Sequence, residues 1–222
     1  MKSIYSKPEK SVINKLIYTL VCHFYAYFSI FLIKFLFEIL DIFKKKKNFY
    51  TFKEFQISND YLVQESNLKI LFSSIIFAPI IEEVFFRLHL NLKNNNIIIS
   101  IFCIFIFTLL KYKIHTIEFI LFFVYGTYLI ILLLFLKNKI ISQNLIKKIN
   151  FFTTIFFFGI FHFLHYKIFK NKFIFFYLIN VMPMFIFGYY FSKIRLKFNI
   201  FWSILLHAMS NLIPCLIIIL NR

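Results

Sequence analysis

The sequence predicts an all-α protein whose helices cross a membrane several times, and two observations carry this prediction. Hydrophobic residues make up 61% of the 222 residues, and phenylalanine alone occurs 36 times, well above the apolar share of a soluble domain. Apolar runs of about 20 residues recur along the chain, which is the length that a helix needs to cross a hydrocarbon core of about 30 Å.

Seven stretches are candidate spans, at residues 12–40, 69–90, 96–110, 117–136, 149–169, 172–192 and 199–220. The third stretch is short for a span, which leaves open a tilted, re-entrant or simply buried helix. The first stretch follows several lysines, as a signal peptide would. Because its apolar run is too long for a signal peptide and no small-residue cleavage site follows, we expect a retained first span.

Connections between these stretches are mostly shorter than ten residues, so we expect one integral membrane domain over residues 1–222 and no soluble domain. The longest connection, 41–68, begins with a run of four lysines and continues with polar residues. We interpret it as an interfacial loop or a short amphipathic helix.

The formal net charge of +17 does not indicate nucleic-acid binding, because the lysines lie in the connections rather than on one face. Membrane lipids with anionic headgroups are the expected counter-charge. Lysine and arginine divide almost evenly between the two sets of connections, so the positive-inside rule does not orient the chain. Cys22, Cys103 and Cys215 all lie in apolar runs, and we expect small buried side chains without a disulfide.

The segment PIIEEVFFRLHL, residues 79–90, places three charges inside a predicted span. A charge at the bilayer centre costs roughly 2.5–3.5 kcal/mol on insertion scales, so such residues usually have a function. Glu83 and Arg87 are four residues apart in the order that favours an intrahelical ion pair. Glu82 is rotated by about 100° from Glu83 on the helix, which leaves one carboxylate without an obvious partner.

Two later spans carry further polar side chains at helical spacing. His162 follows Phe158 by four residues, and Asn211 follows His207 by four residues. One carboxylate, two imidazoles and one carboxamide from three helices form a set that can activate water and stabilise an oxyanion. Joint occurrence of these residues with Glu82 indicates an intramembrane hydrolytic site.

The remaining polar residues of the apolar runs give weaker indications. His162 and His165 are three residues apart and could chelate a metal, but no second pair accompanies them. An asparagine in a span often only joins helices. We interpret four further histidines as structural residues: His23, His89, His115 and His165. The other polar residues in predicted spans are Lys34, Glu38 and Asn180.

Three motifs occur in order along the chain: EEVFFR (82–87) fits E-E-x-x-x-R, FGIFH (158–162) fits F-x-x-x-H, and HAMSN (207–211) fits H-x-x-x-N. With this order and spacing the chain resembles the CPBP family of intramembrane proteases, which comprises the CAAX proteases and bacteriocin-processing enzymes and is also called the Abi family. The segment 187–212 is similar to the family's terminal region, with a glycine, a basic turn and a tryptophan before the histidine. The resemblance covers about residues 70–215.

The resemblance implies a role for each matching residue. The first glutamate would activate water with the histidine of the second motif beside it, and the histidine and asparagine of the third motif would bind the oxyanion. The second glutamate and the arginine would support the site. The implied catalytic residues are Glu82, His162, His207 and Asn211, with Glu83 and Arg87 as supporting residues.

The resemblance leaves the use of a metal open. The family is grouped with metallopeptidases, yet its mechanism is also described as glutamate-dependent without an essential metal. The chain contains no H-E-x-x-H, so spacing does not support a tightly held zinc. Zinc remains a possible cofactor, with Glu82, His162 and His207 as candidate ligands.

Glycine is scarce, and its positions exclude several classes of site. The chain has glycine only at Gly126, Gly159 and Gly188. A serine-type G-x-S-G site, an aspartyl-type G-x-G-D site and a phosphate-cradling glycine loop therefore cannot occur.

We therefore predict an intramembrane endopeptidase, a hydrolase of the bacterial cytoplasmic membrane that cleaves a membrane-associated peptide by glutamate-activated water. The peptide would be a lipidated C-terminus or a bacteriocin leader, and the sequence does not choose between them. Two alternatives stay open. One is a non-catalytic immunity or regulatory membrane protein of the same fold. The other is a small transporter or proton relay, although the sequence shows no inverted repeat.

Overall fold

A computed structural model describes residues 11–44, 66–110, 116–138, 141–164 and 174–220. These residues are helical apart from short turns, and they contain no strand, which confirms the predicted all-α class. The helices are α1 (Val12–Lys44), α4 (Asn67–Leu71), η2 (Phe72–Phe77), α5 (Ala78–Arg87), η3 (Leu88–Asn91), α6 (Asn94–Leu110), α7 (Thr116–Asn138), α8 (Gln143–Leu164), α9 (Ile174–Lys197) and α10 (Ile200–Leu220).

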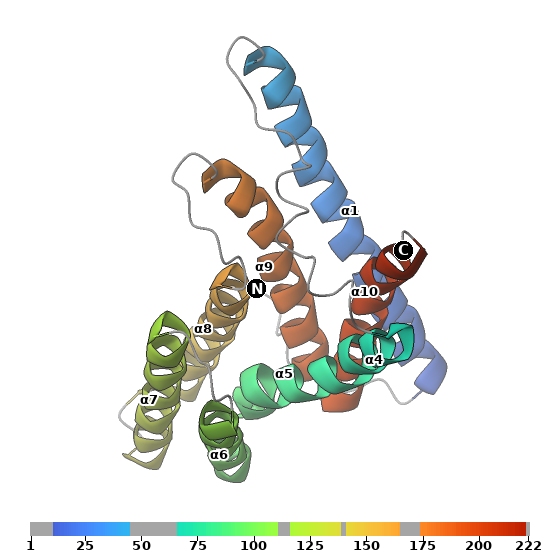
Figure 1. Cartoon of the computed structure of the whole chain (residues 1–222). Helices are drawn as coiled ribbons and strands as arrows, with labels where there is room; N and C mark the ends of the chain where they lie inside the picture. Colours follow the sequence, from blue (N-terminus) through green and yellow to red (C-terminus); the bar gives the residue numbers. More distant parts are fainter. Residues whose placement is uncertain (1–10, 45–65, 111–115, 139–140, 165–173, 221–222) are drawn as a thin grey trace.

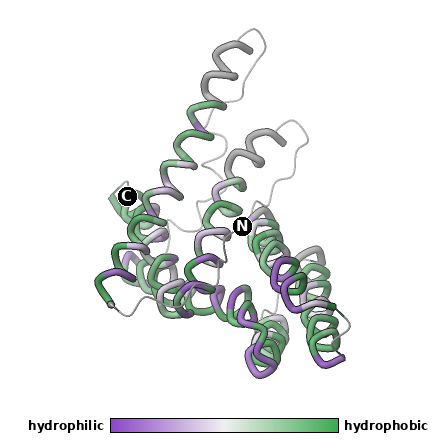
Figure 2. Tube along the Cα trace, turned by 180° about the vertical axis from the view of Figure 1, so that it is seen from behind, coloured by the Kyte–Doolittle hydropathy of each residue, from purple (hydrophilic) through white to green (hydrophobic). Residues whose placement is uncertain are grey.

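Each of the seven predicted stretches contains helix, which is consistent with a membrane protein. Within the described residues, four helices are long and apolar enough to cross a membrane, at Val12–Leu36, Phe119–Asn138, Gln143–His162 and Ile200–Ile217. The apolar helix α6 is shorter, as its sequence suggested. Hydrophobic residues run along most of the helices (Figure 2). The three cysteines are free. Cys22 and Cys215 are buried, as expected, whereas Cys103 is only half-buried.

The predicted interfacial loop falls mostly outside the described residues, as do His115 and His165. Of the stretch 41–68, the first four residues end α1 and the last two begin α4.

Helix α9 forms the middle of the molecule and packs against α1, α8 and α10. Figure 1 shows α4 and α5 as parts of one rod that runs across the lower ends of α9 and α10. Contacts of α10 with α4, η2 and α5 fix this rod along much of its length. The rod carries the charged segment into the centre of the bundle.

The rod contains a π-helical turn that is followed directly by Ala78 and Pro79. The N–H of Ala78 donates to the carbonyl of Ser73, five residues back, which is the spacing of a π-helix. In this register the next donor would be the N–H of residue 79 and the next acceptor the carbonyl of Ser74. Pro79 has no N–H, so the Ser74 carbonyl must find a partner outside its own helix.

The C-terminal end of α5 is fixed by a cation from α9. The Arg195 side chain donates from Nε to the carbonyl of Arg87 and from Nη2 to that of Leu88, both at 3.2 Å. Terminal carbonyls of a helix lack partners within the helix and favour a positive charge. The chain then turns through Leu92, whose φ of 58° is left-handed.

Two glycines bring α8 and α9 close together at the level of the second motif. A Cβ at Gly159 would lie 2.5 Å from the Phe185 ring, and a Cβ at Gly188 would lie 3.1 Å from the Phe158 ring. The first distance is far below any real contact, so a larger residue at 159 would force the Phe185 ring to move. Small residues allow membrane helices to approach in this way.

Candidate functional site

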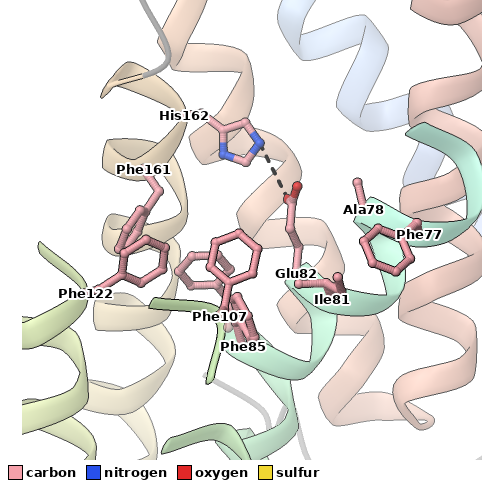
Figure 3. A pocket seen from close by; sticks show the side chains of 10 residues that line it. Phe77, Ala78, Ile81, Glu82, Phe85, Phe107, Phe122, Phe161 and His162 are labelled. Carbon is pink, nitrogen blue, oxygen red and sulfur yellow. Dashed lines mark ion pairs between the residues drawn. The ribbon is translucent and has the colours of Figure 1, made fainter. Parts of the chain in front are cut away.

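Side chains from the three motifs meet where α5, α8 and α10 come together. Glu82 Oε2 lies 3.5 Å from His162 Nε2 and 3.7 Å from His207 Nε2. Figure 3 shows the Glu82 carboxylate pointing from α5 toward the His162 ring. The structure thus brings together three of the four residues that the sequence indicated as catalytic.

The neighbouring carboxylate has a different environment. Arg87 donates to Glu83 Oε1 at 2.5 Å, and both side chains are fully buried. His207 Nδ1–H donates to the same oxygen at 3.2 Å, and the Ser203 hydroxyl donates to Glu83 Oε2. The pair that the four-residue spacing predicted is present. Together, Arg87, His207 and Ser203 use both oxygens of Glu83.

Aromatic rings enclose the Arg87 guanidinium. Its central carbon lies 4.2 Å from the centre of the Phe158 ring and 4.9 Å from that of the Phe191 ring. The faces of aromatic rings carry partial negative charge and attract cations, most strongly where water is excluded. Two rings and one carboxylate therefore offset the cost of burying this charge.

Hydrogen bonds fix the orientation of both histidine rings. His162 Nδ1 lies 2.8 Å from the carbonyl of Phe158, which accepts only, so Nδ1 carries the proton. This bond spans four residues and gives the F-x-x-x-H motif a structural reason. His207 likewise donates its Nδ1–H to Glu83. In both rings Nε2 is the atom that faces Glu82.

Charge and exposure distinguish Glu82 from Glu83. The side chain of Glu82 is 25% exposed, whereas that of Glu83 is 0% exposed. With neutral imidazoles, the two carboxylates and Arg87 leave one net negative charge. Within the described residues Glu82 Oε2 has no hydrogen-bond partner. Two adjacent carboxylates with such different environments are typical of one structural and one reactive group.

Asn211 has a different partner from the other motif residues. Its amide Nδ2 donates to the carbonyl of Ser74 at 2.8 Å, which is the acceptor that Pro79 leaves without a donor in the π-helical turn. The side chain therefore joins α10 to η2. An amide nitrogen carries two hydrogens, so the expected oxyanion role of Asn211 stays a prediction.

Three contributors to the site were missed by sequence reasoning. Ser203 precedes His207 by four residues and shares its face of α10, so the helical spacing could have indicated it. Phe191 stacks on the His207 ring with centroids 4.5 Å apart, and Arg195 holds the end of α5. These two come from α9, and no local pattern connects them to the motifs.

A separate group of buried polar residues lies between η3, α7 and α8. His89 Nε2 lies 3.2 Å from Thr154 Oγ1 and 3.3 Å from the Tyr125 hydroxyl. The amide of Asn150 donates to the His89 carbonyl at 3.4 Å. This group ties η3 to α7 and α8, in agreement with the interpretation of His89 as structural.

The residues nearest to a metal site are Glu82, His162 and His207, a donor set that suits zinc. In the part of the chain that the structure describes, however, no group of three or more His, Cys, Asp or Glu side chains is placed so that it could hold a metal ion. Zinc binding by these three residues therefore stays a prediction.

A pocket of about 180 Å³ opens beside the Glu82 carboxylate. Glu82 and His162 form one side of it, and the other lining residues are Phe77, Ala78, Ile81, Phe85, Phe86, Phe107, Phe122 and Phe161. Figure 3 shows the rings gathered below His162 and beside Glu82.

Comparison of the chain with protein-family models, with curated proteins and with solved structures finds no match. The similarity to the CPBP family therefore rests on the three motifs.

Removal of the Arg87 charge should destabilise the protein. Arg87→Ala leaves Glu83 buried without its counter-charge, which costs on the order of 3–5 kcal/mol in broken buried pairs. We expect poor expression or a strongly lowered melting temperature in detergent, with partial rescue by Glu83→Gln in the same chain. Lys193→Ala on α9 is the control, because its ammonium lies 5.8 Å from the Tyr189 ring centre and 6.0 Å from that of Tyr190 and is not part of the pair. An Arg87→Ala protein that melts like the wild type would contradict the pairing.

The link between Asn211 and the proline is open to a double-mutant cycle. Asn211→Ala leaves the Ser74 carbonyl without a donor, which should cost about 1–3 kcal/mol. Pro79→Ala restores a backbone N–H at position 79 that can take over this carbonyl. We therefore expect the cost of Asn211→Ala, measured by unfolding in detergent, to fall below about 0.5 kcal/mol in the Pro79→Ala background. If Asn211→Ala costs the same free energy of unfolding in both backgrounds, the Asn211 amide does not compensate for the missing N–H of Pro79.

Proposed function

We propose that the protein is an intramembrane endopeptidase in which Glu82 is the general base. The observation that carries this proposal is the contrast between two adjacent carboxylates. Glu83 is paired with Arg87 and fully buried, whereas Glu82 faces two imidazole nitrogens beside a pocket. A carboxylate oxygen without a hydrogen-bond partner is costly in an apolar bundle, and a catalytic task accounts for its presence.

In the proposed reaction Glu82 takes a proton from a water molecule while the water oxygen bonds to the carbonyl carbon of a peptide. The carbonyl oxygen becomes an oxyanion as its double bond opens. The carbon–nitrogen bond then breaks, and the proton held on Glu82 passes to the leaving amine. His162, fixed through its Nδ1–H to the Phe158 carbonyl, presents Nε2 as an acceptor that orients the water beside Glu82.

His207 and Asn211 are the proposed oxyanion donors. His207 already donates its Nδ1–H to Glu83, so it must carry a second proton on Nε2 to donate to the oxyanion. A positive charge on this ring also balances the one net negative charge of Glu82, Glu83 and Arg87. The second amide hydrogen of Asn211 is the further donor, and donors fixed in advance of the reaction stabilise such charge most effectively.

The three motifs support membership of the CPBP family, and with it a substrate at the membrane. A lipidated C-terminus and a bacteriocin leader both fit the proposed chemistry. The bacterial cytoplasmic membrane is the proposed location, and membrane lipids are the expected surroundings of the exposed apolar side chains of α1, α7 and α10.

Glu82→Gln tests the general base directly. The change keeps the size of the side chain and removes its basicity, so the protein should fold while turnover of a cleaved peptide falls by at least about 10²-fold. The same change at Glu38 in α1 is the matched control and should leave turnover unchanged. A well-folded Glu82→Gln protein that cleaves at the wild-type rate would end this mechanism. Proton or ion flux in proteoliposomes without any cleaved product would favour the transporter instead.

The proposed chemistry uses no metal, so chelators provide a second test. We expect purified protein to keep nearly all its peptidase activity after treatment with EDTA or phenanthroline. Loss of activity that stoichiometric zinc restores would change the roles of Glu82, His162 and His207 from base and donors to metal ligands.

A further inference from the structure

The pocket beside Glu82 is continuous with the proposed reaction centre. Glu82 and His162 line it and are themselves 3.5 Å apart. Any group that enters the pocket from a peptide bound at Glu82 must belong to a residue close to the scissile bond. The pocket is therefore placed to select among substrates.

Aromatic side chains form most of the pocket wall. The rings of Phe85 and Phe107 are 5.2 Å apart, those of Phe107 and Phe122 5.7 Å, and those of Phe122 and Phe161 4.4 Å. These rings come from four helices, α5 to α8, and make a continuous apolar surface. Apart from Glu82 and His162, no lining residue among those described has a polar side chain.

This lining favours an apolar occupant. A charged or amide side chain placed against the rings would lose its hydration without gaining hydrogen bonds. An apolar side chain gains about 25 cal/mol for each Å² removed from water.

The volume of the pocket matches that of one large side chain. An apolar cavity of about 150 Å³ in another protein holds a benzene molecule, and the pocket here has about 180 Å³. Pockets for drug-sized ligands usually have about 300–1,000 Å³. A lipid chain of several isoprene units is much larger than benzene, so it would have to lie elsewhere.

We propose that this pocket is a specificity site, which holds one large apolar side chain, of leucine to phenylalanine size, from the residue beside the scissile bond. The proposal rests on the proposed peptidase function and makes it more specific. A lipid anchor on the substrate, if there is one, lies outside the pocket and contacts the membrane.

Substitutions at Ala78 and Phe107 can make the pocket smaller and larger, respectively, while Glu82 and His162 stay unchanged. Ala78 lies one helical turn before Glu82 on the same face of α5 and is the smallest lining residue. Ala78→Leu would fill part of the space. Phe107→Ala on α6 would enlarge the pocket from the opposite wall. Phe102→Ala, an exposed phenylalanine of the same helix, is the matched control for the second change.

The test is cleavage of a peptide series that differs only in the residues on either side of the scissile bond, which carry Ala, Leu, Phe, Trp, Asp or Lys in turn. At one of these positions wild-type kcat/KM should rise about 10- to 100-fold from Ala to Leu or Phe and fall for Asp and Lys. Ala78→Leu should reduce kcat/KM for the Phe peptide at least about 10-fold and change the Ala peptide little. Phe107→Ala should shift the preference toward Trp, and Phe102→Ala should not.

Several outcomes would overturn the specificity site. Cleavage that is independent of side-chain size, or that prefers Asp or Lys, would refute the site while leaving the peptidase intact. The same holds if Ala78→Leu and Phe107→Ala fold normally and keep the wild-type preference, as expected if a lipid chain fills the pocket instead. If no peptide is cleaved, binding of the series to the Glu82→Gln protein decides. If the Glu82→Gln protein binds the Phe peptide most tightly and Ala78→Leu abolishes this preference, the specificity site is supported although the peptidase function has failed. If it binds all peptides of the series equally, both proposals are refuted.

Discussion

The buried ion pair between Glu83 and Arg87 is the interaction on which the rest of the site depends. Both charges come from α5, and neither is exposed. Three other helices supply the groups that make their burial tolerable: α8 and α9 provide the rings of Phe158 and Phe191, and α10 provides the Ser203 hydroxyl. A charge buried without such partners costs several kcal/mol. The four helices are therefore held in one arrangement, because only that arrangement surrounds the pair.

This arrangement also sets the position of Glu82. Successive residues of a helix point about 100° apart, so fixing Glu83 toward Arg87 and His207 directs Glu82 toward the gap between α8 and α10. His207 connects the two carboxylates, with Nδ1 toward Glu83 and Nε2 toward Glu82. Glu83 thus orients the His207 ring, whose other nitrogen faces Glu82. A change at Glu83 or Arg87 would be felt at Glu82 although it removes no proposed catalytic group.

Sequence reasoning predicted the ion pair within α5 and indicated Glu82, His162 and His207, which the structure brings together from three helices. It missed the residues of α9 that complete the site. The pair of Glu83 and Arg87 follows from the four-residue spacing. Composition and the recurring apolar runs predicted the all-α class with helices long enough to span a membrane. The roles of Phe191 and Arg195 depend on how α9 lies against α5 and α10, which no local pattern encodes. Pro79 shows an intermediate case. The sequence shows that Pro79 lacks an N–H. The hydrogen bond from Asn211 to the Ser74 carbonyl, however, depends on the packing of α10 on η2 and could not be predicted.

Phenylalanine links the charged site to the apolar bundle. The Phe158 ring lies over the Arg87 guanidinium and against the His162 ring, while the Phe158 carbonyl fixes the His162 nitrogen. A few residues along α8, the Phe161 ring belongs to the pocket wall. The same residue type therefore stabilises buried charge, orients an imidazole and keeps the space beside Glu82 apolar. Because water is excluded from such surroundings, each remaining electrostatic interaction is stronger than it would be in solvent. A carboxylate set among these rings is thereby suited both to proton transfer and to the recognition of an apolar neighbour.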